Sequence, residues 1–114
     1  MSKKKVIRYL TIPEVRAMLE EMWIGIESEL NDVQKSVLNY VRDFSKMSKE
    51  KAIELLNFLV NEIGIKEELA VQIVNTAPLS RSELRALIFK DYPLLETKKY
   101  DEIIKKIKES IEKK

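Results

Sequence analysis

The chain has 114 residues, with no cysteine and no histidine, and its 21 Lys and Arg against 19 Asp and Glu give a formal net charge of +2. The missing residue types exclude a disulfide-held scaffold and remove the usual ligands of zinc and blue-copper sites. A net charge this small excludes a strongly basic nucleic-acid binder, so contact with nucleic acid would depend on local patches.

The length is that of one ordinary domain. No apolar run approaches the roughly 20 residues of a membrane span, and the basic residues 2–5 are not followed by an apolar signal core. We therefore expect a cytoplasmic protein with no membrane association. Charged residues make up 35% of the chain, so most of them must lie on the solvated faces of amphipathic helices.

The first segment, residues 5–10, is rich in β-forming residues. Val6, Arg8 and Leu10 would share one face of a strand, with Ile7 and Tyr9 on the other. No second convincing strand follows, and a lone strand cannot satisfy its own backbone N–H and C=O groups. The pattern therefore favours a strand that pairs with a sheet of another chain.

The first helix is predicted to begin at Thr11, because Thr11 and Glu14 have capping-box spacing and Pro13 fits the first turn. Apolar residues then recur at helical spacing. They are Val15, Met18, Leu19, Met22 and Ile26. Trp23 and Ile24 widen this stripe beyond what one packed face needs.

The second helix is predicted to start at Asn31 and the third at Ser48, with Gly64 ending the third in a left-handed turn. The apolar residues of the second helix are expected to face inward. They are Val33, Val37, Leu38, Tyr40, Val41 and Phe44. The inward stripe of the third helix is expected to be Ala52, Ile53, Leu56, Leu59, Val60 and Ile63.

Three further helices follow. The fourth stops at Pro78, the fifth opens with a capping box at Ser80 and Glu83 and is closed by Pro93, and the last opens near Thr97. Tyr100, Ile103, Ile104, Ile107 and Ile111 give the last helix one apolar edge beside a charged face. The expected fold is all-α, a bundle of about six helices with a short N-terminal β-strand that pairs with a partner chain.

No catalytic constellation is found in the sequence. Without His and Cys the common nucleophile–base pairs cannot form, and neighbouring carboxylates such as Glu20 and Glu21 point in different directions on a helix. Gly25 and Gly64 are isolated, so a phosphate-binding glycine loop is not expected. We expect a protein that binds other macromolecules, with no enzymatic activity, metal or cofactor.

Two features could carry binding. The first is the unpaired strand together with the wide stripe of the first helix, although Trp23 could equally fill the chain's own bundle. The second is basic charge near the two ends of the chain, including Arg85 and Lys90. Intervening carboxylates weaken that field, so a solvated helix face is the better interpretation of these charges alone.

Several segments, taken in order, are similar to one known family, the archaeal RNA polymerase counterpart of the fourth subunit of eukaryotic RNA polymerase II. Residues 9–15 resemble its strand-to-helix entry, and residues 38–40 with 44–46 resemble its second helix. Residues 70–75, then Pro78, then residues 83–87 resemble its most recognisable stretch. Each piece is modest alone, but their order and spacing extend over nearly the whole chain.

The resemblance implies a non-catalytic polymerase subunit with an HRDC-like helical bundle. It implies a stalk heterodimer, attached to the polymerase core, with the archaeal counterpart of the seventh eukaryotic subunit, which we call the seventh-subunit counterpart. The stalk is associated with open-complex formation, processivity, initiation-factor contacts and guidance of nascent RNA. The resemblance further implies that residues 1–28 dock on the partner and that residues 29–114 form the bundle.

The resemblance also suggests site residues. Partner contacts are expected at Val6, Ile7, Tyr9, Leu10, Leu19, Met22 and Trp23. Arg85 is the motif-matched candidate for RNA contact, while Lys90, Lys105 and Lys108 are added from their charge. Two alternatives stay open: a free-standing HRDC-type domain that binds single-stranded nucleic acid, and a helical adaptor that self-associates through its N-terminal strand.

Overall fold

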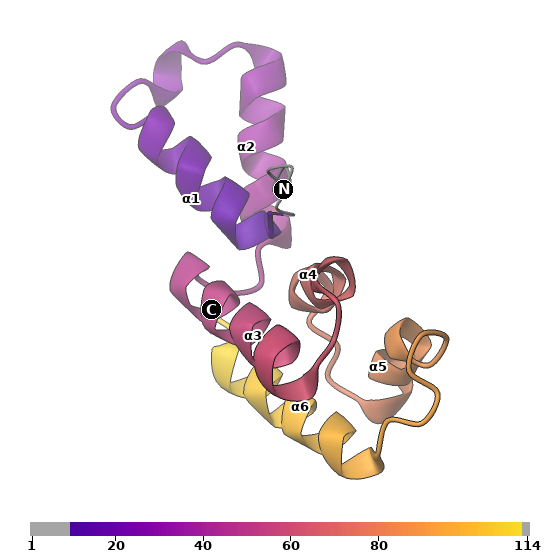
Figure 1. Ribbon diagram of the computed structural model, residues 1–114. Coiled ribbons are helices and arrows are strands. Elements are labelled where there is room, and N and C mark those ends of the chain that lie inside the picture. Colours follow the sequence, from indigo (N-terminus) through magenta and orange to yellow (C-terminus); the bar gives the residue numbers. More distant parts are fainter. Residues whose placement is uncertain (1–9, 113–114) are drawn as a thin grey trace, which may run out of the picture.

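The structure is a computed structural model that describes residues 10–112, and over this range the chain is helical with no strand (Figure 1). The α-helices are α1 (Ile12–Met22), α2 (Asp32–Phe44), α3 (Lys49–Asn57), α4 (Glu67–Thr76), α5 (Arg81–Ile88) and α6 (Thr97–Ser110). A 3₁₀ turn, η1 (Glu27–Glu29), lies between α1 and α2, and a π-helical turn, η2 (Phe58–Ile63), continues α3.

These helices confirm the predicted all-α class and the number of helices for the part of the chain described. The predicted strand cannot be compared in the same way. Residues 5–9 lie outside the described range, and the pairing of that segment with a partner stays a prediction. Leu10, the one described residue of the segment, has no regular secondary structure. Over residues 10–112 no helix is long and apolar enough to span a bilayer.

The predicted helix starts are confirmed at Thr11, Asn31, Ser48 and Ser80, which are the N-caps of α1, α2, α3 and α5. In each case the side-chain oxygen accepts a hydrogen bond from a backbone N–H of the first turn, which that turn cannot satisfy by itself. A local four-residue pattern is enough to define these starts, which is why the sequence predicts them.

The cap of α5 differs from the predicted capping box in one respect. The Ser80 hydroxyl accepts from the Glu83 N–H at 3.2 Å, as expected. The Glu83 carboxylate, however, accepts from the N–H of Leu79 at 3.0 Å, one residue before the cap. The carboxylate still satisfies a free N–H at the helix entry, so the start of the helix is unchanged.

The third helix was predicted to run to Ile63, but regular α-helix ends at Asn57 and a π-helical turn follows. Gly64 then adopts the predicted left-handed conformation, with φ of 89°. The carbonyl of Leu59 accepts from the N–H groups of both Gly64 and Ile65, at 3.0 and 2.9 Å. This double acceptance closes the widened turn and redirects the chain into α4.

The helices form two parts that lie one above the other in Figure 1. Helices α1 and α2 make an antiparallel hairpin, and α3 to α6 make a bundle. The radius of gyration is 16.1 Å, against about 13 Å expected for a single compact domain of this length. The chain is therefore less compact than a single globular domain, and its two parts have separate hydrophobic clusters.

The larger cluster fills the bundle and includes the predicted edge of α6, namely Tyr100, Ile103, Ile104 and Ile107. The smaller cluster lies inside the hairpin, where Leu30, Leu38 and Val41 are buried and Ile12, Val15, Leu19 and Trp23 pack against them. The boundary between the residues of the two clusters lies near Ser45. The division predicted from the sequence, with residues 1–28 docking on a partner and residues 29–114 forming the bundle, concerns partner binding and stays a prediction.

The predicted inward orientation of the second helix is wrong for four of its residues. Val33, Val37, Tyr40 and Phe44 are exposed, and Leu38 and Val41 are the buried members of the set. The reason is that α2 packs chiefly against one helix, α1, and one neighbour covers a single narrow stripe. A helix inside a bundle of several neighbours would have had its wider apolar arc covered.

The hairpin is fixed to the bundle at the start of α1. The Ile12 N–H donates to Asn75 Oδ1 on α4 at 2.8 Å, and the Thr11 side chain is fully buried. The Glu14 carboxylate is also buried and accepts from both the N–H and the hydroxyl of Thr11 at 3.0 Å. The capping box of α1 therefore also serves as the joint between the two parts.

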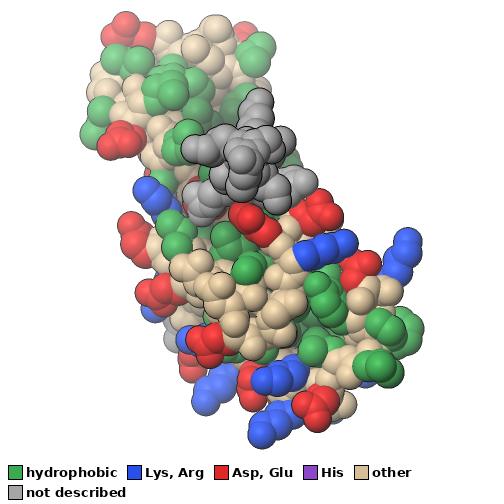
Figure 2. Space-filling model, viewed as in Figure 1, with side chains coloured by type: hydrophobic (Ala, Val, Ile, Leu, Met, Phe, Trp, Pro, Cys, Tyr) green, Lys and Arg blue, Asp and Glu red, His purple; other side chains and the backbone are tan. Residues whose placement is uncertain are grey.

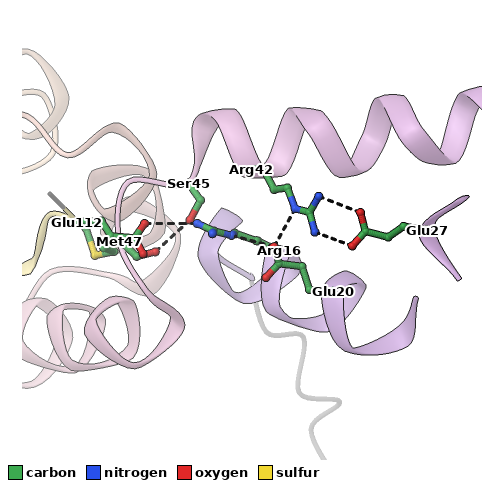
Figure 3. Close-up of polar contacts among 7 residues, drawn as sticks. All are labelled: Arg16, Glu20, Glu27, Arg42, Ser45, Met47 and Glu112. Atoms are coloured by element: carbon green, nitrogen blue, oxygen red, sulfur yellow. Dashed lines mark hydrogen bonds and ion pairs between the residues drawn. The ribbon is translucent and has the colours of Figure 1, made fainter. Parts of the chain in front are cut away.

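Arg16 and Glu112 add a second contact across the joint, with an Nη1–Oε1 distance of 3.4 Å (Figure 3). The Glu112 N–H also donates to the carbonyl of Lys46 at 2.9 Å, which ties the end of the described chain to the segment between α2 and α3. Helix α1 also packs against α3, so the hairpin contacts the bundle at α3, at α4 and at the residues just after α6.

Replacing Thr11 by Ala should destabilise the protein by about 1–2 kcal/mol, the upper part of the range of about 0.5–2 kcal/mol for loss of a Ser or Thr cap. The variant removes the cap of α1 and one donor to the buried Glu14 carboxylate. Ser48→Ala at the more exposed cap of α3 is the matched control and should cost less. Urea unfolding of both variants checks this, and equal losses would contradict a special role for the α1 cap.

Candidate partner-binding surface

The exposed large hydrophobic side chains of the described residues are concentrated on one part of the molecule. Nine of twelve lie between residues 10 and 44, on or beside the hairpin, and three lie elsewhere. The nine are Leu10, Met18, Met22, Ile24, Ile26, Val33, Val37, Tyr40 and Phe44. Figure 2 shows hydrophobic side chains over this upper part, while most of the visible Lys and Arg lie over the bundle.

Helix α2 carries a continuous exposed apolar stripe. Val33, Val37, Tyr40 and Phe44 recur at steps of four, three and four residues, which places them on one side of the helix. Val33 is 71% exposed and Tyr40 is 55% exposed. The rings of Tyr40 and Phe44 pack on each other with centroids 4.7 Å apart, so the end of the stripe is a paired aromatic surface.

The opposite side of the hairpin is ionic. Arg42 donates through Nε to Glu20 Oε2 at 2.8 Å and through its two terminal nitrogens to the Glu27 carboxylate at 3.2 and 3.0 Å (Figure 3). Arg16 Nε donates to the same Glu20 oxygen at 3.3 Å. The two Arg and two Glu residues link α1, η1 and α2 across this side.

Helical geometry shows that the apolar residues of α1 and α2 share one face. Glu20 directly follows the inward residue Leu19, and Arg42 directly follows the inward residue Val41. Their ion pair shows that the positions directly after the inward residues lie on the same side of the hairpin in both helices. Because successive residues turn by about 100° around the helix axis, the residues that directly precede the inward ones lie on the other side. Met18, Met22, Val37 and Tyr40 hold such preceding positions, and Val33 and Phe44 extend the same stripe of α2. We call these six residues the hairpin face.

The pKa shifts of Glu20, Glu27 and Arg42 keep the ionic side of the hairpin charged. Burial alone would raise the pKa of Glu20, but hydrogen bonds from Arg42 and Arg16 outweigh it, so the pKa is below its ordinary value. Hydrogen bonds from Arg42 also lower the pKa of Glu27, and the two carboxylates raise the pKa of Arg42. Both carboxylates are charged at neutral pH, which makes this side strongly hydrated and unsuitable as a dry interface.

The structure places the predicted partner-binding residues in different settings. Met22 is 63% exposed on the hairpin face, and Leu10 is 42% exposed just before α1. Leu19 and Trp23 pack against the hairpin's own cluster and are partly covered. The remaining three, Val6, Ile7 and Tyr9, lie outside the described residues. Partner binding by these residues stays a prediction.

Sequence reasoning missed the α2 half of the hairpin face. Val33, Val37, Tyr40 and Phe44 were assigned to the core because their spacing is the same for a buried and an exposed stripe. One available signal was the width of the apolar arc on the second helix, which exceeds what one antiparallel neighbour can cover.

The predicted nucleic-acid residues do not form one patch. Arg85 and Lys90 line an open depression on α5, whereas Lys105 and Lys108 line another on α6 together with Asp101 and Glu109. The carboxylates of the α6 depression weaken its attraction for phosphate. Among residues 10–112 no group of three or more Asp or Glu side chains is placed to hold a metal ion.

Two comparisons with known proteins relate the chain to others. The family model described as RNA polymerase Rpb4 matches residues 9–111. The chain is also similar to the DNA-directed RNA polymerase subunit Rpo4 of Methanocaldococcus jannaschii, with 36% identity over 93 residues. That alignment covers 79% of this chain and 77% of the relative.

Glu20→Gln should lower the free energy of unfolding at pH 7 by less than about 1 kcal/mol, because the side chains of the Arg42–Glu20 ion pair are about one-third exposed. The lowered pKa of Glu20 means that this stabilisation exists above the unfolded pKa and is lost as the pH falls through the folded pKa. The difference in free energy of unfolding between Glu20→Gln and wild type should therefore shrink toward zero below about pH 4.

Chemical denaturation at a series of pH values measures this difference. Glu21→Gln, at the exposed neighbouring position, is the matched control and should show no such pH dependence. A Glu20→Gln difference that stays constant down to pH values at which carboxylates are protonated would contradict the ionic account of this side of the hairpin.

Proposed function

Because the chain belongs to the RNA polymerase Rpb4 family, we propose that it is a non-catalytic accessory subunit of an archaeal RNA polymerase that forms the stalk heterodimer with the seventh-subunit counterpart. Family membership makes the chain a component of an RNA polymerase complex. The choice of partner, the stalk position and the absence of a catalytic role are proposals.

The exposed hairpin face is the observation that carries the proposal. Its six side chains are of the Met, aliphatic and aromatic types that are enriched in interface cores. Exposed apolar side chains gathered on one face are uncommon on a monomeric protein and are typical of a binding site for another macromolecule. We propose that the seventh-subunit counterpart covers this face, with the paired rings of Tyr40 and Phe44 as anchors.

The N-terminal segment extends the same proposal. Residues 6–10 would complete a sheet of the seventh-subunit counterpart by strand addition, since the sequence provides them with no partner strand of their own. Leu10 leads directly into Thr11, which is fixed at the joint between hairpin and bundle. Strand addition and the hairpin face would then give the partner two points of attachment, one by backbone pairing and one by side-chain packing.

The separation of hairpin and bundle suits a protein that holds a partner on one part and presents the other (Figure 1). We propose that the heterodimer supports open-complex formation, processivity and contact with nascent RNA and an initiation factor, in the cytoplasm. RNA contact is proposed for the heterodimer as a whole. The four candidate cations of this chain lie in two separate places and give it little affinity alone.

Val37→Asp and Met22→Asp test the hairpin face, because both side chains are already solvated in the free chain. Each change should leave stability within about 0.5 kcal/mol. Each should weaken a one-to-one complex with a co-expressed seventh-subunit counterpart by about tenfold or more, because a charge would be desolvated in the interface. Isothermal titration calorimetry measures the affinity and thermal unfolding measures the stability.

Leu94→Asp is the matched control, since Leu94 is 92% exposed but lies between α5 and α6, away from the hairpin. It should not change the affinity. A well-folded chain that shows no association with the seventh-subunit counterpart at micromolar concentration would overturn the proposal and favour the free-standing nucleic-acid-binding alternative.

Affinity of this chain alone for single-stranded RNA separates the two functions further. Arg85 and Lys90 can contact two phosphates at most. Since each contact with a single strand contributes about −0.7, the logarithm of the binding constant should fall against the logarithm of the salt concentration with a slope of about −1.4. A free-standing nucleic-acid binder would engage more phosphates and show a steeper slope. Fluorescence anisotropy of a labelled uridine oligonucleotide over a salt series measures it, and a slope steeper than about −3 would favour the alternative.

A further inference from the structure

Helix α5 carries a second surface, on the part of the bundle remote from the hairpin (Figure 1). An open depression of about 690 Å³ runs along it and is lined by Arg81, Ser82, Arg85, Ala86, Phe89 and Lys90. Ser82, Ala86 and Phe89 follow one another at steps of four and three residues, so they share one side of the helix. We call these six residues the α5 surface.

The floor of the α5 surface is apolar and its rim is cationic. Phe89 is 48% exposed, an uncommon position for a Phe ring without a partner, and Ala86 beside it leaves room for an incoming side chain. No carboxylate lines the depression. A partner that combines an apolar side chain with negative charge would therefore match both the floor and the rim.

The three cations of the rim are not equivalent. Arg81 donates through Nε and Nη2 to the two oxygens of Asp101, both at 2.8 Å, so its charge is already neutralised. Among the described residues, Arg85 and Lys90 form no ion pair with a carboxylate. The Arg85 guanidinium lies 5.8 Å from the centroid of the Phe89 ring and 5.1 Å from that of Tyr100.

These two ring contacts hold Arg85 in place without satisfying its hydrogen-bond donors. A guanidinium stacked on aromatic rings keeps its planar edge free to donate two parallel hydrogen bonds to one carboxylate. Because the side chain is already held next to Phe89, less conformational entropy is lost when a carboxylate binds there. The arrangement is therefore suited to one acidic group beside one apolar group.

Nucleic acid fits this surface less well. A single strand binds by several successive phosphate contacts and base stacks, whereas the α5 surface offers two unpaired cations and one exposed ring. Carboxylates lie close by in the sequence, at Glu83 on α5 and at Asp91 after it, and the chain has a net charge of only +2. A polyanion would meet too little positive potential, while a short acidic peptide needs only local complementarity.

We propose that the α5 surface binds a short acidic segment of a partner protein, with an apolar side chain on Phe89 and Ala86 and a carboxylate on Arg85. Lys90 contributes a second, non-directional attraction at the end of the helix. This site is separate from the hairpin face and does not depend on the identity of the partner there. It would let one chain hold one protein at the hairpin and recruit another at the bundle.

Titration of the full-length chain with a short fluorescein-labelled peptide of Asp, Glu, Leu and Phe tests this proposal by fluorescence anisotropy. If the free chain does not stay monomeric, its complex with the co-expressed seventh-subunit counterpart is used instead. Binding should weaken by about tenfold in Phe89→Ser and in Arg85→Glu, and by less in Arg85→Lys, which keeps the charge without the planar fork. Lys105→Glu on α6 is the matched control and should bind as wild type.

Two companion probes complete the experiment. The same peptide with Leu and Phe replaced by Ala should bind more weakly, since it lacks the apolar contact. A uridine oligonucleotide of similar length should bind more weakly than the acidic peptide. The proposal is overturned if no acidic peptide binds at millimolar concentration or if Phe89→Ser and Arg85→Glu leave peptide binding unchanged. Tighter binding of the oligonucleotide that is lost in these variants would instead identify a nucleic-acid site.

Discussion

The buried joint at the start of α1 is the constraint on which the arrangement of the molecule depends. Thr11 caps α1, its N–H and hydroxyl donate to Glu14, and the N–H of Ile12 donates to Asn75 of α4. A helix N-terminus has unsatisfied N–H groups that must find partners when it is buried. Here the partners come from both parts of the chain, so satisfying them also fixes the hairpin relative to the bundle.

A hairpin held in this way is covered on one side only. The inner stripes of α1 and α2 cover each other, and the remaining sides of the two helices have different chemistry. Arg42, Glu20 and Glu27 keep one side charged and hydrated, while the hairpin face leaves aliphatic and aromatic side chains in water. Covering that face would remove apolar surface from water, at roughly 25 cal/mol per Å². The hairpin therefore has a physical reason to bind a partner, and its ionic side indicates the orientation.

The bundle has the opposite character, because its helices cover one another. Its cluster buries the apolar edges of α3 to α6, and most of the Lys and Arg side chains visible in Figure 2 lie over it. On the α5 surface an exposed Phe89 lies beside cations, whereas the other exposed large apolar side chains of the bundle, Leu79 and Leu94, do not line that depression. The two proposed binding surfaces thus lie in different parts of the chain, one large and apolar, the other small and of mixed character. This separation would allow one subunit to contact two proteins at once.

The sequence by itself determined the helices and their starts, because capping and turn chemistry are local. Thr11, Asn31, Ser48 and Ser80 satisfy N–H groups within a few residues, and Gly64 adopts the left-handed conformation that glycine allows at low cost. Only the tertiary structure decided which apolar stripe is covered. Val37 and Leu38 are both apolar residues of α2, yet one is exposed and the other buried. The difference depends on how many helices surround α2. Helical periodicity gives the width of the apolar arc but not the number of neighbours that cover it.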